Sequence, residues 1–340
     1  MRSSLRGCCA LLVAMAALGP SAAFAQPAAT PEPPTTMASG VLVDLQTKKV
    51  LWAKDDRAQR APASLTKILT ALTVLDRAHL EDTAVISSAA RNARGGRMYA
   101  EEGWTFTIQD LLWGLMLQSG NDAAITLAEK VSPDGTVEGF MKLANAKAVS
   151  LGATDSSFQN PHGLDQPGHM TTARDLAIIT GAAMENPVFV QIVSSKTHVV
   201  PWGDGQPHMF INHNKMLWRA PGAIGVKTGF TEGAGNCLIS AMNRDGHTLV
   251  AVVLGTPNHY AESTALFDWG FANLEALRAN STSDIRKPVS SDAFGTGPNG
   301  LDVTESSTSG VPRLLLPALA MVVTVTLGIA FRQRLIFQRP

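Results

Sequence analysis

The sequence lacks an excess of either charge. Its 340 residues include 28 basic and 28 acidic side chains, so the formal net charge is zero when histidine is neutral. Attraction of nucleic acid or another polyanion usually depends on an excess of positive charge. The composition therefore predicts no nucleic-acid partner. With 45% hydrophobic residues, it is typical of an ordinary globular protein.

Cysteine is scarce, and the histidines are scattered. Cys8 and Cys9 lie in the first apolar run, which leaves only Cys237 further along the chain. A lone cysteine forms no internal disulfide, and its apolar neighbours in "NCLISAM" predict a buried strand residue. No pair among the eight histidines has the spacing of a zinc site with a third ligand nearby. We therefore expect no metal and no other cofactor.

The N-terminal segment has the features of an export signal. Arg2 and Arg6 precede the apolar run "CCALLVAMAAL", and the triplet "AFA" that ends at Ala25 has the small-x-small pattern of a cleavage site. The alternative is a short membrane anchor, but the apolar run is too short to span a bilayer. We predict that residues 1–25 are a removed signal peptide.

A second apolar segment lies near the C-terminus. The stretch "LLLPALAMVVTVTLGIAF" carries no charge and is long enough to cross about 30 Å of hydrocarbon, which predicts a transmembrane helix at 313–331. Arginines follow it, and positive residues stay on the cytoplasmic side, so 332–340 should be a cytoplasmic tail. A buried core helix is the alternative. The chain would then be a single-pass protein of the cell membrane with its main part outside the cytoplasm.

Two linkers separate these segments from the main folded unit. Residues 26–37 are rich in proline, and residues 280–312 are rich in Ser, Thr, Gly and Pro, so neither is expected to pack. Between them, residues 38–279 are long enough for one sizeable core with two lobes.

The pattern of elements in this unit is β, then α, then β. "GVLVDLQTKKVLWA" alternates as a hairpin does, and "NCLISAMNRDGHTLVAVVLG" is a second hairpin with Asp-Gly at its turn. Helical patterns lie between them, among them a helix opened by Pro62, and "ESTALFDWGFANLEAL" closes the unit as one helix. The sequence therefore predicts an α+β fold, with one antiparallel sheet built from both ends, flanking helices and a helical lobe.

Ser64 and Lys67 stand three residues apart at the start of the helix that Pro62 opens. This spacing places both on one helix face, within reach of each other. A serine hydroxyl becomes a nucleophile when a base takes its proton, and a lysine is such a base only when its amine is neutral. Burial and a second nearby cation favour that form. The pair is a candidate catalytic centre, although Ser-x-x-Lys alone is a weak motif.

Two further short motifs support this interpretation. Ser119 and Asn121 flank a glycine in the break between two helical patterns, a position that projects a hydroxyl and an amide into a cleft. Lys227, Thr228 and Gly229 lie on the strand that leads into the second hairpin, where a glycine lets a substrate backbone approach closely. Each motif occurs once in the chain, and their order and setting favour one site.

With these motifs in place, the sequence resembles the penicillin-recognising serine D,D-peptidases, and among them the low-molecular-mass D-alanyl-D-alanine carboxypeptidases. The resemblance covers about 38–279. It implies the penicillin-binding or β-lactamase-like fold. The stretches that carry it are "PASLTKILTAL", "LLWGLMLQSGNDAAITLAE", "NPHGLD", "TTARDLA" and "GVKTGFTEGAGNCLISA".

The resemblance also implies roles for the reacting groups. Ser64 would be the acylated nucleophile, Lys67 its general base, and Ser119 a proton relay toward the leaving amine. The backbone N–H groups of Ser64 and Phe230 would form the oxyanion hole. The activity would be removal of the terminal D-alanine from peptidoglycan stem peptides, and β-lactams would acylate the same serine.

Substrate-binding roles follow from the same resemblance. Asn121 would hydrogen-bond the substrate's peptide, Lys227 would set the local field, and Thr228 would help to hold the terminal carboxylate. Gly229 and Phe230 would also be substrate-binding residues. The partners would thus be stem peptides that end in D-Ala-D-Ala, β-lactam antibiotics as covalent inhibitors, and the membrane through the C-terminal helix.

The chain departs from its relatives at two histidines. Many relatives carry an arginine before the last helix to grip the substrate carboxylate, and an ungapped count puts His259 there. His213, between two asparagines, also stands where relatives often have another residue. The carboxylate clamp is therefore the part of the resemblance that this sequence supports least.

Four rival functions remain to be compared. A class A β-lactamase needs a glutamate for deacylation, and the helical part contains no Glu-x-x-Leu-Asn. A membrane-tethered β-lactam sensor without turnover usually needs a signalling domain, and only "RQRLIFQRP" follows the predicted span. A Ser-His-Asp hydrolase would need a Gly-x-Ser-x-Gly elbow, which is absent. An endopeptidase that cuts cross-links between stems stays open.

Overall fold

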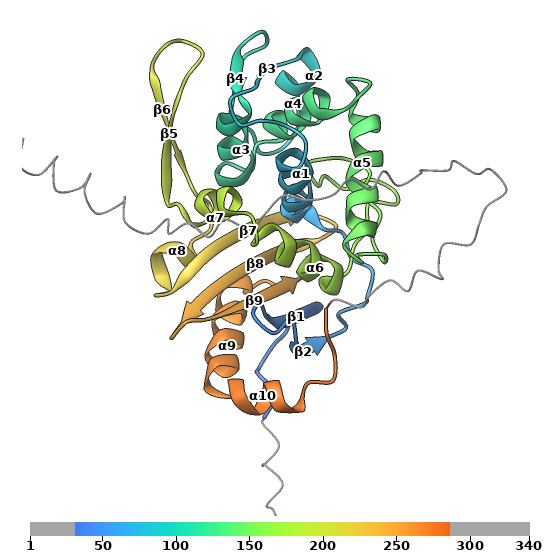
Figure 1. The fold of residues 1–340 in the computed structure, drawn as a ribbon, viewed down its shortest axis with the longest axis vertical. Helices are drawn as coiled ribbons and strands as arrows, with labels where there is room; N and C mark the ends of the chain where they lie inside the picture. Colours follow the sequence, from blue (N-terminus) through green and yellow to red (C-terminus); the bar gives the residue numbers. More distant parts are fainter. Residues whose placement is uncertain (1–30, 286–340) are drawn as a thin grey trace, which may run out of the picture. The chain divides into compact units, whose positions relative to one another are not determined.

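The computed structural model of the protein describes residues 31–285 (Figure 1). The predicted signal peptide (1–25), transmembrane helix (313–331) and cytoplasmic tail (332–340) lie outside the described residues, as does most of the second linker. These predictions therefore stay predictions.

A five-stranded antiparallel sheet forms the centre of the described part, in the order β2-β1-β9-β8-β7. Its strands are β1 (Ser39–Asp44), β2 (Val50–Lys54), β7 (Ala223–Thr231), β8 (Gly235–Arg244) and β9 (His247–Leu254). Both predicted hairpins are present, and β1 pairs with β9 along its whole length. The predicted antiparallel sheet built from both ends of the unit is confirmed.

Apolar side chains cover both faces of this sheet. Along β9, Val250 and Val252 belong to the larger core, whereas Leu249, Ala251 and Val253 belong to a second core on the opposite face. This alternation follows from the two-residue period of a strand. Helices pack against each face, so the central strands are buried on both sides.

Helices lie above and below the sheet in the described part of the chain. On one side lie η1, a 3₁₀ turn (Ala63–Leu65), α1 (Thr66–Leu75), α2 (Ser88–Arg91), α3 (Ile108–Leu117), α4 (Asn121–Val131), α5 (Val137–Ser150), α6 (Ala173–Ala183) and α7 (Pro187–Ser194). The short helix α8 (Met216–Arg219) precedes β7. On the opposite face lie α9 (His259–Ala272) and α10 (Leu274–Asn280) (Figure 1). The helices α1 to α5, with the small sheet of β3 (Thr83–Val85) and β4 (Thr105–Thr107), form the predicted helical lobe.

A hairpin that the sequence reading did not predict projects beside this lobe (Figure 1). Its strands are β5 (Thr197–Pro201) and β6 (Pro207–Ile211). Stacking of His198 on Trp113, with ring centroids 3.7 Å apart, and contacts of Trp202 with Trp104 attach it to the lobe. One face of the hairpin therefore belongs to the protein core, and the other face is exposed.

The packed unit extends beyond both predicted boundaries, 38 and 279. Met37 is fully buried, and the Glu262 carboxylate accepts its backbone N–H at 3.0 Å. At the other end, Ile285 is 4% exposed and donates its N–H to the Lys48 carbonyl at 3.0 Å. The prediction that neither linker packs is therefore wrong for these flanking residues. A single buried apolar residue in a polar stretch gives no periodic signal.

The predicted C-terminal helix is also two helices rather than one. The helix α9 ends and α10 begins around Asn273, whose φ is −119° and whose side-chain amide donates to the Trp269 carbonyl at 2.8 Å. Asparagine side chains compete with the backbone for such carbonyls, which favours a break at this point.

Within residues 31–285, no single helix has both the length and the apolar character needed to cross a membrane. Only α6 and α7 taken together have that length and composition, and the two helices are bent by 109° at the break between them.

Candidate active site

Ser64 lies on η1, the turn that leads into α1. Pro62 caps this turn, so the predicted helix start is confirmed, with a 3₁₀ first turn. Ala63 has a φ of +49°, a strained conformation for a residue with a side chain. The Thr66 hydroxyl donates to the Ala63 carbonyl at 3.0 Å and so helps to hold this turn.

Lys67 projects from the first turn of α1 into a fully buried position. Its Nζ lies 3.1 Å from Ser64 Oγ, 2.7 Å from Asn121 Oδ1 and 2.6 Å from the His162 carbonyl oxygen. Its exposed fraction is 0%. The predicted proximity of Ser64 and Lys67 is thus present, and Asn121 joins them.

Burial is the main reason that the pKa of Lys67 lies well below its usual value. The positive charge of Lys227 lowers this pKa further, whereas the carboxylate of Asp122 acts in the opposite direction. A neutral amine has a free lone pair, which a proton from Ser64 can occupy. The site therefore favours the form of Lys67 that can act as a base.

Ser119 and Asn121 occupy the break between α3 and α4, as predicted. Ser119 has a φ of +57°, and Asn121 begins α4. The Asn121 side chain donates to the Arg94 carbonyl at 2.5 Å, and its backbone N–H donates to the Gly96 carbonyl at 2.8 Å. Among residues 31–285, no hydrogen bond joins the Ser119 hydroxyl to Ser64 or Lys67.

Lys227 is the second buried lysine of the site. It is 1% exposed, and its Nζ donates to the Thr228 carbonyl at 2.9 Å. Burial lowers its pKa to about 7. Thr228 is half-buried beside it on β7, and Phe230 is 63% exposed. This strand is the edge of the sheet next to η1.

Gly229 makes a close contact inside the protein, beside the substrate approach expected for it. A Cβ atom added at Gly229 would lie 3.1 Å from the Ala63 Cβ and 3.1 Å from the Ser64 backbone nitrogen. Glycine at this position therefore allows β7 to lie close to the turn that carries Ser64. The backbone N–H groups of Ser64 and Phe230 are the two expected oxyanion donors. This contact places the Ser64 N–H against β7, the strand that contains Phe230.

The loop that contains "NPHGLD" supplies a backbone group that the motif reading did not identify. The His162 carbonyl accepts from Lys67, and the Asn160 side chain accepts the Gly163 N–H at 2.7 Å. Gly163 has a φ of +95°, and a Cβ there would overlap the Ala63 carbonyl oxygen. The loop thus fixes both Lys67 and the η1 turn. A backbone carbonyl carries no residue-type signal in a sequence.

A buried carboxylate also escaped the sequence reading. Asp122 is 0% exposed, and its oxygens accept the N–H groups of Met98 at 3.0 Å and Tyr99 at 2.9 Å. An acidic residue in the first turn of a helix is common, so its type and position gave no special signal.

The two divergent histidines lie near α8 and α9. Burial and then the charge of Lys227 lower the pKa of His213, so its ring lies near the site. The Tyr260 hydroxyl donates to the His213 carbonyl at 3.1 Å. His259 begins α9 and lines a hollow with neighbours that include Met216 and Arg219, and no predicted site residue lines that hollow. This arrangement gives no support for a carboxylate clamp at His259.

Cys237 is buried on β8, as predicted, and its burial raises the pKa of its thiol to about 11. In the described part of the chain, no group of three or more histidine, cysteine or acidic residues could hold a metal ion.

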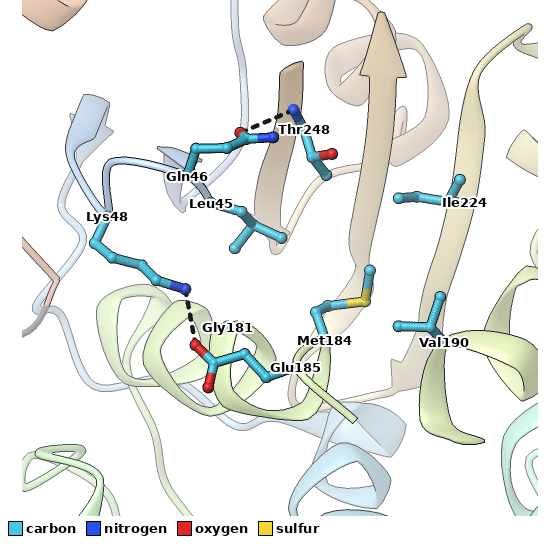
Figure 2. A pocket seen from close by; sticks show the side chains of 9 residues that line it. All are labelled: Leu45, Gln46, Lys48, Gly181, Met184, Glu185, Val190, Ile224 and Thr248. Carbon is cyan, nitrogen blue, oxygen red and sulfur yellow. Dashed lines mark hydrogen bonds and ion pairs between the residues drawn. The ribbon is translucent and has the colours of Figure 1, made fainter. Parts of the chain in front are cut away.

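A separate pocket opens beside the β1–β2 turn (Figure 2). The Lys48 ammonium and the Glu185 carboxylate pair across it at 3.0 Å, and the Thr248 N–H donates to Gln46 Oε1 at 3.0 Å. Its remaining lining residues are Leu45, Gly181, Met184, Val190 and Ile224. None of the predicted site residues lines this pocket.

Comparison with known proteins agrees with this geometry. The model of the D-alanyl-D-alanine carboxypeptidase family Peptidase_S11 matches residues 26–258. D-alanyl-D-alanine carboxypeptidase DacB2 of Mycobacterium tuberculosis is 38% identical over 256 residues, which cover 73% of this chain and 87% of that protein. DacC of Escherichia coli is 34% identical, with 81% of this chain and 71% of the relative covered.

Solved structures give the same result for the fold. The crystal structure of a D-alanyl-D-alanine carboxypeptidase from M. tuberculosis has a TM-score of 0.70 and 36% identity, and covers 76% of this chain and 98% of that one. The Streptomyces K15 DD-transpeptidase has a TM-score of 0.67 and 30% identity, with coverages of 71% and 99%. The fold is thus that of the penicillin-binding DD-peptidases, as the resemblance predicted. The chain belongs to the D-alanyl-D-alanine carboxypeptidase family of serine peptidases.

Proposed function

We propose that this protein is a serine-type D-alanyl-D-alanine carboxypeptidase that removes the terminal D-alanine from peptidoglycan stem peptides through an acyl-enzyme on Ser64. One observation carries this proposal most. The fully buried Lys67 amine lies 3.1 Å from Ser64 Oγ, in surroundings that lower its pKa. A buried neutral lysine is a base that can activate a serine.

Acylation is the first step. Ser64 Oγ attacks the carbonyl carbon of the penultimate D-alanine, and its proton passes to Lys67 Nζ. The N–H groups of Ser64 and Phe230 donate to the oxyanion that forms. The C–N bond then breaks, a proton reaches the leaving amine through Ser119, and free D-alanine departs.

Deacylation completes the cycle. A water molecule loses a proton to the neutral base and attacks the ester carbonyl. The carbon–oxygen bond to Ser64 breaks as Lys67 returns the proton to Ser64 Oγ, and the shortened peptide leaves with a new carboxyl group. Division into two steps replaces one difficult barrier with two lower ones.

Residues on two sides of the site, at the start of α4 and on β7, orient the substrate. Asn121 hydrogen-bonds the peptide on the acyl side of the scissile bond, while Thr228 helps to hold the terminal carboxylate in the local field of Lys227. Gly229 and Phe230 form the β7 wall. The buried charge of Lys227 supports this direction, because a carboxylate there gains a favourable interaction in a dry site.

β-Lactams, which resemble the D-Ala-D-Ala substrate, should acylate the same serine and leave slowly.

We also propose that the protein is exported by residues 1–25 and anchored by a helix at 313–331, with 332–340 inside. The linkers would then join a catalytic unit, 38–279 with its packed flanks, to the outer face of the membrane. An epitope tag inserted in the linker at 26–37 and a second tag at the C-terminus, both probed on intact cells, test this topology. A linker tag that is protected on intact cells, or a C-terminal tag that is accessible, would contradict it.

Release of D-alanine tests the activity. The purified full chain is mixed with diacetyl-lysyl-D-alanyl-D-alanine, beside Ser64→Ala and a control, Ser150→Ala, at an exposed helix end. We expect release by the wild type and the control and none by Ser64→Ala. Covalent binding of penicillin without release would favour a sensor, and release only from cross-linked dimers would favour an endopeptidase.

A further inference from the structure

A short loop lines the site on the Asn121 side. We name residues 94–99 the rim loop. The Asn121 side-chain amide donates to the Arg94 carbonyl of this loop at 2.5 Å. The backbone N–H of Asn121 donates to the Gly96 carbonyl at 2.8 Å. A Cβ at Gly95 would lie 2.9 Å from Asn121 Nδ2, so the loop touches this side chain directly. Since Asn121 also contacts Lys67, the rim loop is two hydrogen bonds from the proposed base.

Tyr99, at the end of the rim loop, is held in an unusual state. Its φ is +69°, which is a strained conformation for a bulky residue, and the side chain is 67% exposed. The buried Asp122 carboxylate accepts the N–H groups of Met98 and Tyr99 and so holds this conformation. Since the Tyr99 ring is mostly exposed, packing in the core does not account for this fixed backbone conformation. Strain of this kind is concentrated at functional sites.

Two cations accompany the ring. The Arg97 guanidinium lies over Tyr99 at 5.0 Å from the ring centroid and donates to the Arg91 carbonyl at 3.1 Å. Arg94 is exposed. Arg91 pairs with Glu101 at 2.6 Å, but among residues 31–285 no ion pair involves Arg94 or Arg97. The rim loop therefore presents two positive charges and an aromatic face without an acidic partner.

We propose that the rim loop is a subsite for a side-chain carboxylate on the stem-peptide residue that precedes D-Ala-D-Ala. This inference rests on the proposed function. The terminal carboxylate lies toward Lys227 and Thr228, so the acyl side of the substrate leaves past Asn121, where the rim loop lies. Arg94 and Arg97 donate to the carboxylate, because guanidinium groups match its geometry. The Tyr99 ring packs on the aliphatic part of the side chain.

A matched pair of substrates tests the charge preference. Both are Nα-acetyl-X-D-alanyl-D-alanine peptides, in which X is 2-aminopimelic acid or the same residue with its side-chain carboxylate converted to a primary amide. With the full chain, we expect kcat/KM to be about threefold to tenfold higher for the acid, since exposed ion pairs are individually weak. This preference should fall as salt rises, because salt screens exposed charges.

Three variants complete the experiment. Arg94→Ala/Arg97→Ala should bring the ratio of the two kcat/KM values close to one. The control, Arg57→Ala, removes an exposed arginine that pairs with Asp155, and should keep the wild-type ratio. Tyr99→Ala should raise KM for both peptides.

The outcomes separate the two proposals. If the double variant keeps the wild-type ratio, or if the wild type shows no preference for the acid, the subsite is wrong while the carboxypeptidase assignment stands. An unchanged KM in Tyr99→Ala overturns the assigned role of the ring. If the wild type releases D-alanine from neither peptide nor from diacetyl-lysyl-D-alanyl-D-alanine, the proposed function fails and the subsite fails with it.

Discussion

Replacement of Lys67 by methionine isolates its role as a base. Methionine keeps most of the volume of the side chain, so it opens no large cavity in this fully buried position. General-base catalysis contributes about 10²–10⁴-fold, which is about 3–5 kcal/mol of barrier at ~1.4 kcal/mol per tenfold. We therefore expect the acylation rate of Lys67→Met to fall by about 10²–10⁴-fold.

The cost in stability should be smaller than the cost in rate. The change leaves Asn121 Oδ1 and the His162 carbonyl without a donor, at about 1–3 kcal/mol each. Removal of a buried amine offsets part of this loss. The free energy of unfolding should thus fall by no more than about 3 kcal/mol, as urea titration would measure.

Stopped-flow acylation with a fluorescent penicillin gives the rate. Lys142→Met is the matched control, because the same chemical change falls on a side chain that is 73% exposed. It should acylate at the wild-type rate. A second variant, Lys67→Arg, keeps hydrogen-bond donors but stays protonated, and it should also fail to acylate. A folded Lys67→Met that acylates at close to the wild-type rate would refute the assignment of the base.

Three other changes have definite expected results. Lys227→Gln removes a charge that lowers the pKa of Lys67, so the acidic limb of the acylation rate should move to higher pH; an unmoved limb in a pH–rate profile would contradict the coupling. Gly229→Ala places a Cβ 3.1 Å from the Ser64 nitrogen, so acylation should slow while the melting temperature stays nearly constant; normal acylation would show that this contact is not critical. His169 is buried, which lowers its pKa to about 4, so the unfolded state binds more protons below about pH 6.5. Stability should thus decline as pH falls from about 6.5 to 4, and less steeply in His169→Gln; equal slopes in urea titrations would count against it.

Short-range patterns in the sequence predicted much of the sheet and the helices. Strand alternation and the Asp-Gly turn located β8 and β9, and helical periodicity with a proline located the start of α1. The hairpin of β5 and β6 also has an Asp-Gly turn, at Asp204 and Gly205, but each of its strands contains a proline, Pro201 or Pro207, which argues against a strand. Local patterns are most informative where one face of an element is polar and the other is apolar.

The proximity of Ser64, Lys67 and Asn121 was predictable because each belongs to a recognisable short motif. The His162 carbonyl was not, since any residue type can supply a backbone oxygen at that point. Gly229 shows a further limit, because the sequence revealed a need for close approach but not which segment approaches. Such partners come from distant parts of the chain and depend on tertiary packing.

Peptide mapping of the penicillin adduct tests the central claim most directly. The full chain is incubated with benzylpenicillin and digested with trypsin, and the adduct is located by mass spectrometry. The predicted tryptic peptide "APASLTK", residues 61–67, contains Ser64 as its only serine. We expect one penicilloyl group on Ser64 and none in Ser64→Ala. An adduct on another residue, or an unmodified Ser64 in active protein, would contradict it.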